Sequence, residues 1–185
     1  QINRVDAAKS NIGNAISFNQ TRDGYLQKVG KSLDRMSELS VLAQDTTKTD
    51  ADRALYDSEF QTLGAFITDT ASKDFNGVSL FSSAAMNVTI DSDGNSYAMS
   101  GVDLGASAYT TATGNDVTTT TNAATALTNV KTAITQLATD RTTVGASNSR
   151  LGSHSDQLAI LKNNLAASNS RIADVDVAEE SRSEE

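Results

Sequence analysis

VKTAITQLATDRTTVGASNSRLGSHSDQLAILKNNLAASNSRI, residues 130–172, carries an apolar residue at every seventh position. The members of this row are Val130, Leu137, Val144, Leu151, Leu158, Leu165 and Ile172. The chain contains no proline, so the surrounding segment 122–177 can form one uninterrupted helix. At about 1.5 Å per residue, that helix is roughly 80 Å long. A compact 185-residue globule has a radius of gyration of only about 16 Å. The pattern therefore predicts a rod in which the row forms an internal seam between helices.

Residues 1–44 carry a seven-residue pattern of their own, which predicts a second long helix. Its apolar positions are Val5, Ala8, Ile12, Ala15, Leu26, Val29, Leu33, Met36 and Ala43. Two polar residues, Asn19 and Arg22, fall inside this seam. Two long helices at opposite ends of the chain should pack side by side, so both ends of the chain leave at the same end of the rod.

A shorter helix is expected between them. The periodicity stops at residues 45–49, where Thr49 or Asp50 suits a helix N-cap. Asp52 then lies in the first turn, where the helix dipole favours negative charge. We expect this helix to run to about Lys73.

From residue 78 to 104 the period changes to two, which predicts short strands at 78–81, 86–90, 97–99 and 102–104. Phe75, Asn76 and Gly77 form a turn signal before them, and residues 91–95 form another between two strands. Residues 105–121 contain little apolar bulk and are predicted to be a loop or a weakly ordered strand.

The predicted fold class is mainly α: an elongated, antiparallel, coiled-coil-like rod of three helices with a small β-hairpin insert at one end. Residues 1–77 and 122–177 form the helical rod. Residues 78–121 form the β insert and loop, and residues 178–185 form a frayed acidic tail.

Composition excludes several classes of partner and site. The net charge is −8 and the isoelectric point is near 4.6, which argues against nucleic acid and anionic membranes as partners. The chain has no cysteine, so it offers neither a disulfide nor a thiolate. No apolar run approaches the 18 or so residues that span a bilayer. Because Gln1 is not an initiator Met and begins inside an apolar pattern, we expect a fragment.

Nothing in the sequence supports catalysis, a metal or a cofactor. His154 is the only histidine, and no nucleophile or orienting partner can be assigned to it. Asp91, Asp93 and Asn95 alternate as at the start of a calcium loop, but the twelfth position is Val102, where an EF-hand needs a glutamate. The interpretation of these residues as a hairpin turn is much stronger, and the chain is predicted not to be an enzyme.

Three motifs in the expected order resemble bacterial flagellin. LDRMSELSV at 33–41 resembles the family's LqRvrELav stretch, FNGV at 75–78 resembles its FNG turn, and SRIADVD at 170–176 resembles its closing S-R-I-x-D-x-D pattern. The resemblance implies a structural filament subunit, with terminal polymerisation segments that are missing here.

That resemblance also implies partners and a location. The partners would be further copies of the chain in a filament, together with the flagellar export chaperone and cap proteins. The location would be the extracellular flagellum, reached through the flagellar export apparatus. We expect the fragment alone to be monomeric.

The family stretch on the first helix is also implied to be an exposed patch that Toll-like receptor 5 recognises. Arg35, Glu38 and Leu39 match the family, whereas Asp34 and Ser37 replace a Gln and an Arg of strongly recognised flagellins. Such charge changes are costly in a small interface, so we expect weak or absent receptor activation.

Three other interpretations compete with that of a flagellin. A flagellar hook–filament junction protein shares related terminal helices and is the main alternative. An enzyme carried in the insert is disfavoured because residues 78–121 are few and contain neither His nor Cys. An unrelated coiled-coil adhesin would show heptads without the FNG and S-R-I-x-D-x-D landmarks.

Overall fold

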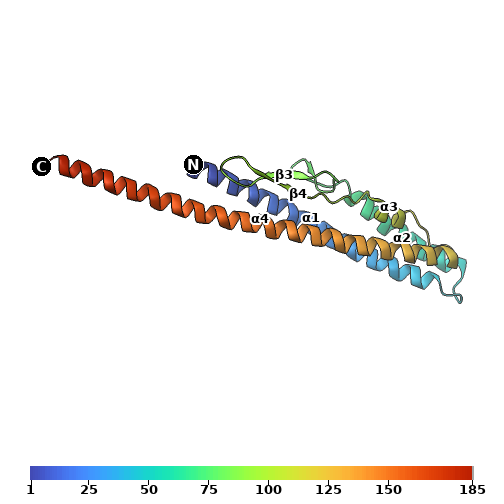
Figure 1. Cartoon of the computed structure of the whole chain (residues 1–185). Coiled ribbons are helices and arrows are strands. Elements are labelled where there is room, and N and C mark those ends of the chain that lie inside the picture. Colours follow the sequence, from blue (N-terminus) through green and yellow to red (C-terminus); the bar gives the residue numbers. More distant parts are fainter. Residues whose placement is uncertain (185) are drawn as a thin grey trace. The chain divides into compact units, whose positions relative to one another are not determined.

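The computed structural model describes residues 1–184 and divides the chain into two compact units. Unit 1 contains residues 1–17, 86–99 and 148–185, and unit 2 contains residues 18–85 and 100–147. Helices α1 and α4 contribute to both units (Figure 1). The elements are α1 (Ile2–Ala43), α2 (Asp50–Thr70), β1 (Asp74–Phe75), β2 (Val78–Ser79), β3 (Met86–Thr89), β4 (Ser96–Met99), α3 (Ser107–Thr113) and α4 (Thr120–Ser183).

In unit 2, α1 packs antiparallel to both α2 and α4. Asp23 of α1 pairs with Arg141 of α4, and farther along α1 a Cβ added at Gly30 would lie 3.2 Å from Cδ2 of Leu137. The missing side chain at Gly30 therefore gives Leu137 its space. Apolar residues from all three helices form the core, including Leu26, Val29, Leu33, Met36, Phe60, Ile67, Val130 and Ala133. Their spacing of three and four residues places them on the facing stripes.

The turn between α1 and α2 is held by side chains that cap both helices. The Thr49 side chain accepts from the Asp52 amide while Asp52 accepts from the Thr49 amide, which is a capping box. The predicted N-cap and first-turn acid are thus confirmed. Arg53 donates from Nε to the Ala43 carbonyl at 2.8 Å and from Nη2 to the Asp45 carbonyl at 2.9 Å. The first bond satisfies a carbonyl that the end of α1 leaves without a helical partner, and the second holds the turn that follows α1.

The strands predicted at 78–81, 86–90 and 97–99 are present as β2, β3 and β4, which form two antiparallel hairpins together with β1. Strands β1 and β2 pair within unit 2, around Asn76 and Gly77, which both have positive φ. Strands β3 and β4 pair within unit 1, and residues 91–95 turn between them as expected. The predicted strand at 102–104 is wrong. Val102 and Leu104 are each buried in unit 2, but neither residue belongs to a strand.

The prediction that residues 105–121 form a loop or weak strand is wrong for its centre, which forms α3. Tyr109 and Ala112 of α3 are buried, and the Tyr109 hydroxyl donates to the carboxylate of Asp140 on α4. Thr113 packs against α2 at Gly64, where an added Cβ would lie 3.6 Å from it, in ordinary van der Waals contact. Tertiary contact therefore stabilises a helix of seven residues that intrinsic propensity alone leaves marginal.

In unit 1, the first part of α1 and the later part of α4 run antiparallel to each other, as the layout in Figure 1 shows. Lys162 pairs with Asp6 at 2.7 Å, and Val5, Ile12, Leu151 and Leu158 are buried. Val88 and Met99 of the β3–β4 hairpin are also buried, and the Arg150 guanidinium lies 4.5 Å from the centre of the Tyr97 ring.

Helix α4 does not end near residue 177 but continues to Ser183. The tail predicted at 178–185 is helical as far as Ser183, and every residue from 166 to 184 is exposed. The predicted fold class, mainly α with a small β insert, is confirmed. Within residues 1–184, no helix has the length and apolarity needed to cross a bilayer.

Candidate functional site

Two surfaces carry the residues that the sequence singled out. The Arg35 surface comprises Asp34, Arg35, Ser37 and Glu38 of α1 with Glu59 of α2, all in unit 2. The α4 terminal surface comprises Ile172, Val175 and Val177 in unit 1.

The Arg35 guanidinium is engaged by two glutamates. Its Nε and Nη2 donate to the two carboxylate oxygens of Glu59 at 2.7 and 3.0 Å, which is a bidentate pair between α1 and α2. Its Nη1 lies 2.9 Å from Oε1 of Glu38, one helical turn along α1. The Arg35 guanidinium is thus oriented by α1 and α2 together, with each of its three nitrogens in contact with a glutamate.

These contacts shift the ionisation of both partners toward the charged forms. The hydrogen bond from Arg35 lowers the pKa of the Glu59 carboxyl, and the bonds to Glu59 and then Glu38 raise the pKa of Arg35. Both groups remain substantially exposed, so solvent and salt screen the pair. Its importance is geometric, because it orients Arg35.

The rest of the predicted receptor patch is only partly at the surface. Asp34 and Glu38 are exposed, and the Ser37 hydroxyl donates to the Asp34 carbonyl at 2.6 Å on its own helix. Leu39, expected in an exposed patch, is 0% exposed and belongs to the core of unit 2. That expectation is corrected, because Leu39 lies on the face of α1 that packs inward.

The seven-residue row follows α4 through both units. Val130, Leu137, Val144, Leu151 and Leu158 are buried, and Leu165 is half-buried. Ile172 was predicted to belong to the internal seam but is 61% exposed. The row therefore changes from core to surface within one continuous helix.

The α4 terminal surface begins where that burial ends. Val175 is 61% exposed and Val177 is 70% exposed. Ile172 and Val175 are three residues apart, so they share one face of α4. Exposed apolar side chains grouped on one helix face are typical of a contact surface for another chain.

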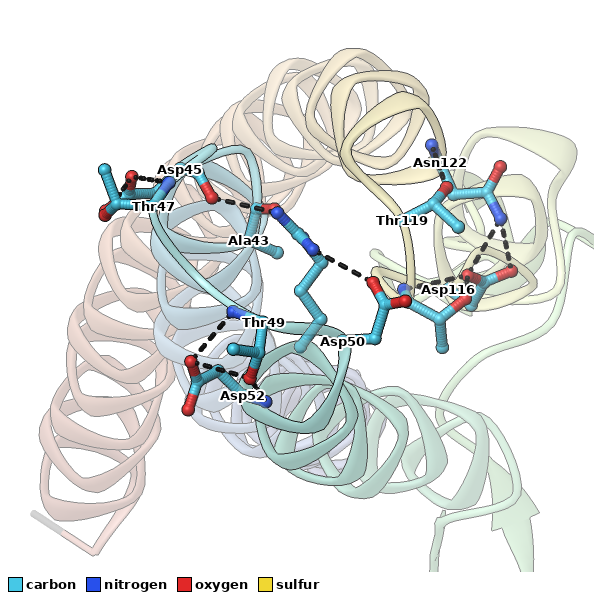
Figure 2. A network of polar contacts seen from close by, with 11 residues as sticks. Ala43, Asp45, Thr47, Thr49, Asp50, Asp52, Asp116, Thr119 and Asn122 are labelled. Atoms are coloured by element: carbon cyan, nitrogen blue, oxygen red, sulfur yellow. Dashed lines mark hydrogen bonds and ion pairs between the residues drawn. The ribbon is translucent and has the colours of Figure 1, made fainter.

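Figure 2 shows a polar network at the α1–α2 turn and the start of α4. Thr47 donates to Asp45 through its hydroxyl and amide, and Thr118 and Asn122 donate to Asp116. Hydrogen bonds from the Thr47 side chain and then its amide lower the pKa of Asp45, and bonds from Thr118 lower the pKa of Asp116. Asp45 and Asp116 therefore stabilise turns of the main chain through these hydrogen bonds. Among the residues described, no group of three or more His, Asp or Glu side chains is arranged to hold a metal ion.

The remaining chemical candidates are the acidic turn at Asp91 and the histidine His154. Asp91 accepts from the amides of Asp93 and Asn95 and from the Asn95 side chain, which lowers its pKa and closes the hairpin turn. The His154 ring lies 6.3 Å from the Tyr97 ring, and its buried Nε2 has no hydrogen-bond partner in the described chain.

Sequence reasoning missed Glu59, the bidentate partner of Arg35. The two residues are 24 positions apart, and only the antiparallel α1–α2 packing brings them together. The available signal was the spacing of Asp52 and Glu59, which are seven residues apart and therefore share one face of α2.

Comparisons with known proteins agree with this architecture. The bacterial flagellin N-terminal helical region matches residues 1–86, and the bacterial flagellin C-terminal helical region matches residues 127–183. A flagellin of Halalkalibacterium halodurans is 32% identical over 97% of this chain and 68% of its own length. The flagellar filament 41 kDa core protein of Borreliella burgdorferi is 37% identical over 48% of this chain, which spans only 27% of that protein.

Solved structures give the same result. Bacillus cereus flagellin has a TM-score of 0.72 at 25% identity, over 86% of this chain and 94% of that one. A Vibrio parahaemolyticus protein described as flagellar hook-associated has a TM-score of 0.74 at 12% identity, over 90% and 92% of the two chains. At that identity the second likeness shows the fold alone. The two flagellin regions and the Halalkalibacterium relative decide the family: the chain belongs to the bacterial flagellins.

Proposed function

We propose that this chain is a structural subunit of the bacterial flagellar filament, which self-assembles through helix faces left exposed by its own fold. The observation that carries the proposal is family membership across both long helices, 1–86 and 127–183. The hook–filament junction alternative has less support, because the hook-associated neighbour shares only the fold.

The exposed apolar side chains of α4 supply a physical basis for self-assembly. In unit 1, Ile172 and Val175 lie on one face of α4, and the last residues of the helix, 179–183, are polar or charged. Burying these side chains against another copy contributes about 25 cal/mol per Å² of apolar surface removed from water. The acidic residues around them limit non-specific association, because like charges repel unless the docking geometry separates them.

The experiment is a polymerisation assay of the protein, followed by electron microscopy. The double variant Ile172→Asp/Val175→Asp should lose filaments, since two carboxylates would be placed in an apolar contact. Ser170→Asp, on the opposite face of the same helix, is the matched control and should still polymerise. Absence of filaments from the unaltered protein would refute the proposed function, and normal filaments from the double variant would refute this surface.

Further partners follow from the family as proposals. They are the export chaperone and the cap protein of the flagellum, with export to the cell exterior through the flagellar export apparatus. A strain that retains the protein in the cytoplasm when the flagellar export apparatus is disabled would support that route.

We also propose that Toll-like receptor 5 recognises this chain weakly. Support comes from the buried Leu39, from the engagement of Arg35 by Glu59 and Glu38, and from the acidic Asp34 beside them. A reporter assay should show weak signalling, and the variant Asp34→Gln/Ser37→Arg should signal more strongly. Potent signalling by the unaltered chain would contradict this proposal.

A further inference from the structure

Arg22 binds two separate stretches of main chain with one guanidinium. Its Nε donates to the Leu80 carbonyl at 2.8 Å, and its Nη1 donates to the Ser100 carbonyl at 3.2 Å. Leu80 precedes the segment 81–99 that carries β3 and β4, and Ser100 follows it. Both ends of that segment therefore meet at a single side chain of α1 within unit 2.

The surroundings of Arg22 are neutral and closed. The side chain is only 3% exposed, its third acceptor is Oδ1 of Asn19 at 3.3 Å, and its guanidinium carbon lies 4.8 Å from the centre of the Phe18 ring. Burial lowers the pKa of Arg22 to about 10, so the group stays charged at neutral pH. A charged donor in such a site makes strong hydrogen bonds to its carbonyls.

Gly101 gives a second, independent observation at the same place. A Cβ added there would lie 2.7 Å from the Ala84 carbonyl oxygen and 2.8 Å from the Ser83 carbonyl carbon, and it would also meet the Ser82 carbonyl. The returning main chain thus runs directly against the outgoing main chain, with no room for a side chain. Backbone atoms cannot yield as the end of a flexible side chain can.

We propose that Arg22 and Gly101 form a latch that holds residues 80–85 and 100–104 closed, and that this latch opens as a local unit while α1, α2 and α4 stay folded. Leu80 and Ser100 lie outside every helix and strand of the described chain, so breaking their bonds to Arg22 disrupts no ladder. Opening these stretches exposes Leu80, Val102 and Leu104, which are buried in unit 2, so the bonds to Arg22 add to this burial in setting the free energy of local opening. The edge contact between Phe81 and Tyr25 opposes full release of the outgoing stretch.

The sequence permits a clean test by limited proteolysis of the 185-residue chain. Residues 74–130 contain no Lys or Arg, so trypsin reports on the helices and never cuts the latched stretches. Thermolysin cleaves beside apolar residues such as Phe81, Val102 and Leu104, and mass spectrometry locates its cuts.

Arg22→Met should speed thermolysin cleavage within residues 80–104 by about tenfold or more, with tryptic cleavage changed less than about twofold. The rate of thermolysin cleavage in Arg22→Lys should lie between those of Arg22→Met and the unaltered chain, because an ammonium lacks the planar fork that spans two carbonyls. Gly101→Ala should reproduce Arg22→Met. Arg141→Met, at the exposed pair with Asp23, and Ser100→Ala, which keeps its carbonyl, are the controls and should behave as the unaltered chain does.

Unchanged thermolysin cleavage in Arg22→Met would overturn the latch. So would equal acceleration by both proteases in Arg22→Met and Gly101→Ala, because that result shows global unfolding rather than local opening. If Arg22→Met does not fold, Arg22→Lys and Gly101→Ala decide the matter by the same criteria.

Discussion

The two ends of α4 use the same apolar spacing with opposite results. In unit 2 the row members Val130, Leu137 and Val144 are buried, whereas in unit 1 Ile172 is exposed together with every described residue from 166 onward. One stretch packs among helices of its own chain, and the other has no cover among the residues described. A seven-residue pattern therefore indicates that a helix face requires a partner, but not that the partner belongs to the same chain.

The largest expected effect tests the buried end. Leu137→Ala should lower the free energy of unfolding by about 2–5 kcal/mol, through lost burial and the cavity left beside Gly30. Urea denaturation followed by circular dichroism measures it. Ile172→Ala is the matched change at the exposed end and should cost less than about 0.5 kcal/mol. Equal losses of stability in Leu137→Ala and Ile172→Ala would show that the two ends of α4 do not differ in packing.

A smaller effect is expected at two helix glycines, Gly145 in unit 2 and Gly152 in unit 1. Nothing in the described structure lies within 4 Å of a Cβ added at either position. Each change to Ala should therefore raise the free energy of unfolding by about 0.5–1 kcal/mol, through helix propensity. Thermal denaturation measures the gain.

Gly30→Ala is the control for these glycines. Its Cβ would meet Leu137 Cδ2 at 3.2 Å, so the gain should be smaller there. A loss of stability at Gly145 or Gly152 would contradict the open space around them. A loss of filaments without a loss of stability would show that a neighbouring subunit uses that space.

The smallest effect concerns the pair that joins α1 to α4 in unit 2. The hydrogen bond from Arg141 lowers the pKa of Asp23 below its ordinary value of 3.8. The pair's contribution is therefore complete above about pH 4 and is lost as the pH falls through the lower, folded-state pKa. Because Arg141 is 43% exposed, we expect less than about 1 kcal/mol.

Asp23→Asn and Arg141→Gln should each remove that contribution, and their stabilities should converge with that of the unaltered chain in acid. Urea titrations at pH 7, 4 and 2.5 measure the differences. A difference that persists unchanged at the lowest pH would show that the two side chains act by packing rather than by charge.

Features set by neighbouring residues could be predicted from the sequence. The cap at Thr49, the turns at 76–77 and 91–95, and the long helices all depend on spacings within a few positions. Such spacings determine which backbone groups and apolar faces can be satisfied locally.

Features that depend on distant residues could not be predicted from the sequence. Helix α3 depends on Tyr109 reaching Asp140, and the burial of Leu39 depends on which stripe of α1 faces inward. Val102 and Leu104 alternate with polar residues as in a strand, and both are buried. Alternation alone does not show whether a neighbouring strand is present to pair with them. Glu59 likewise has no local relation to Arg35.

The carbonyls held by Arg53 have a consequence for the order of folding. The contact from Arg53 to Ala43 spans 10 residues, whereas that from Arg141 to Asp23 spans 118. Closing the longer loop costs about 2 kcal/mol more in chain entropy at room temperature. The α1–α2 hairpin should therefore form early, and α4 should dock onto it late. Changes at Arg53 would slow folding, while changes at Arg141 would mainly hasten unfolding.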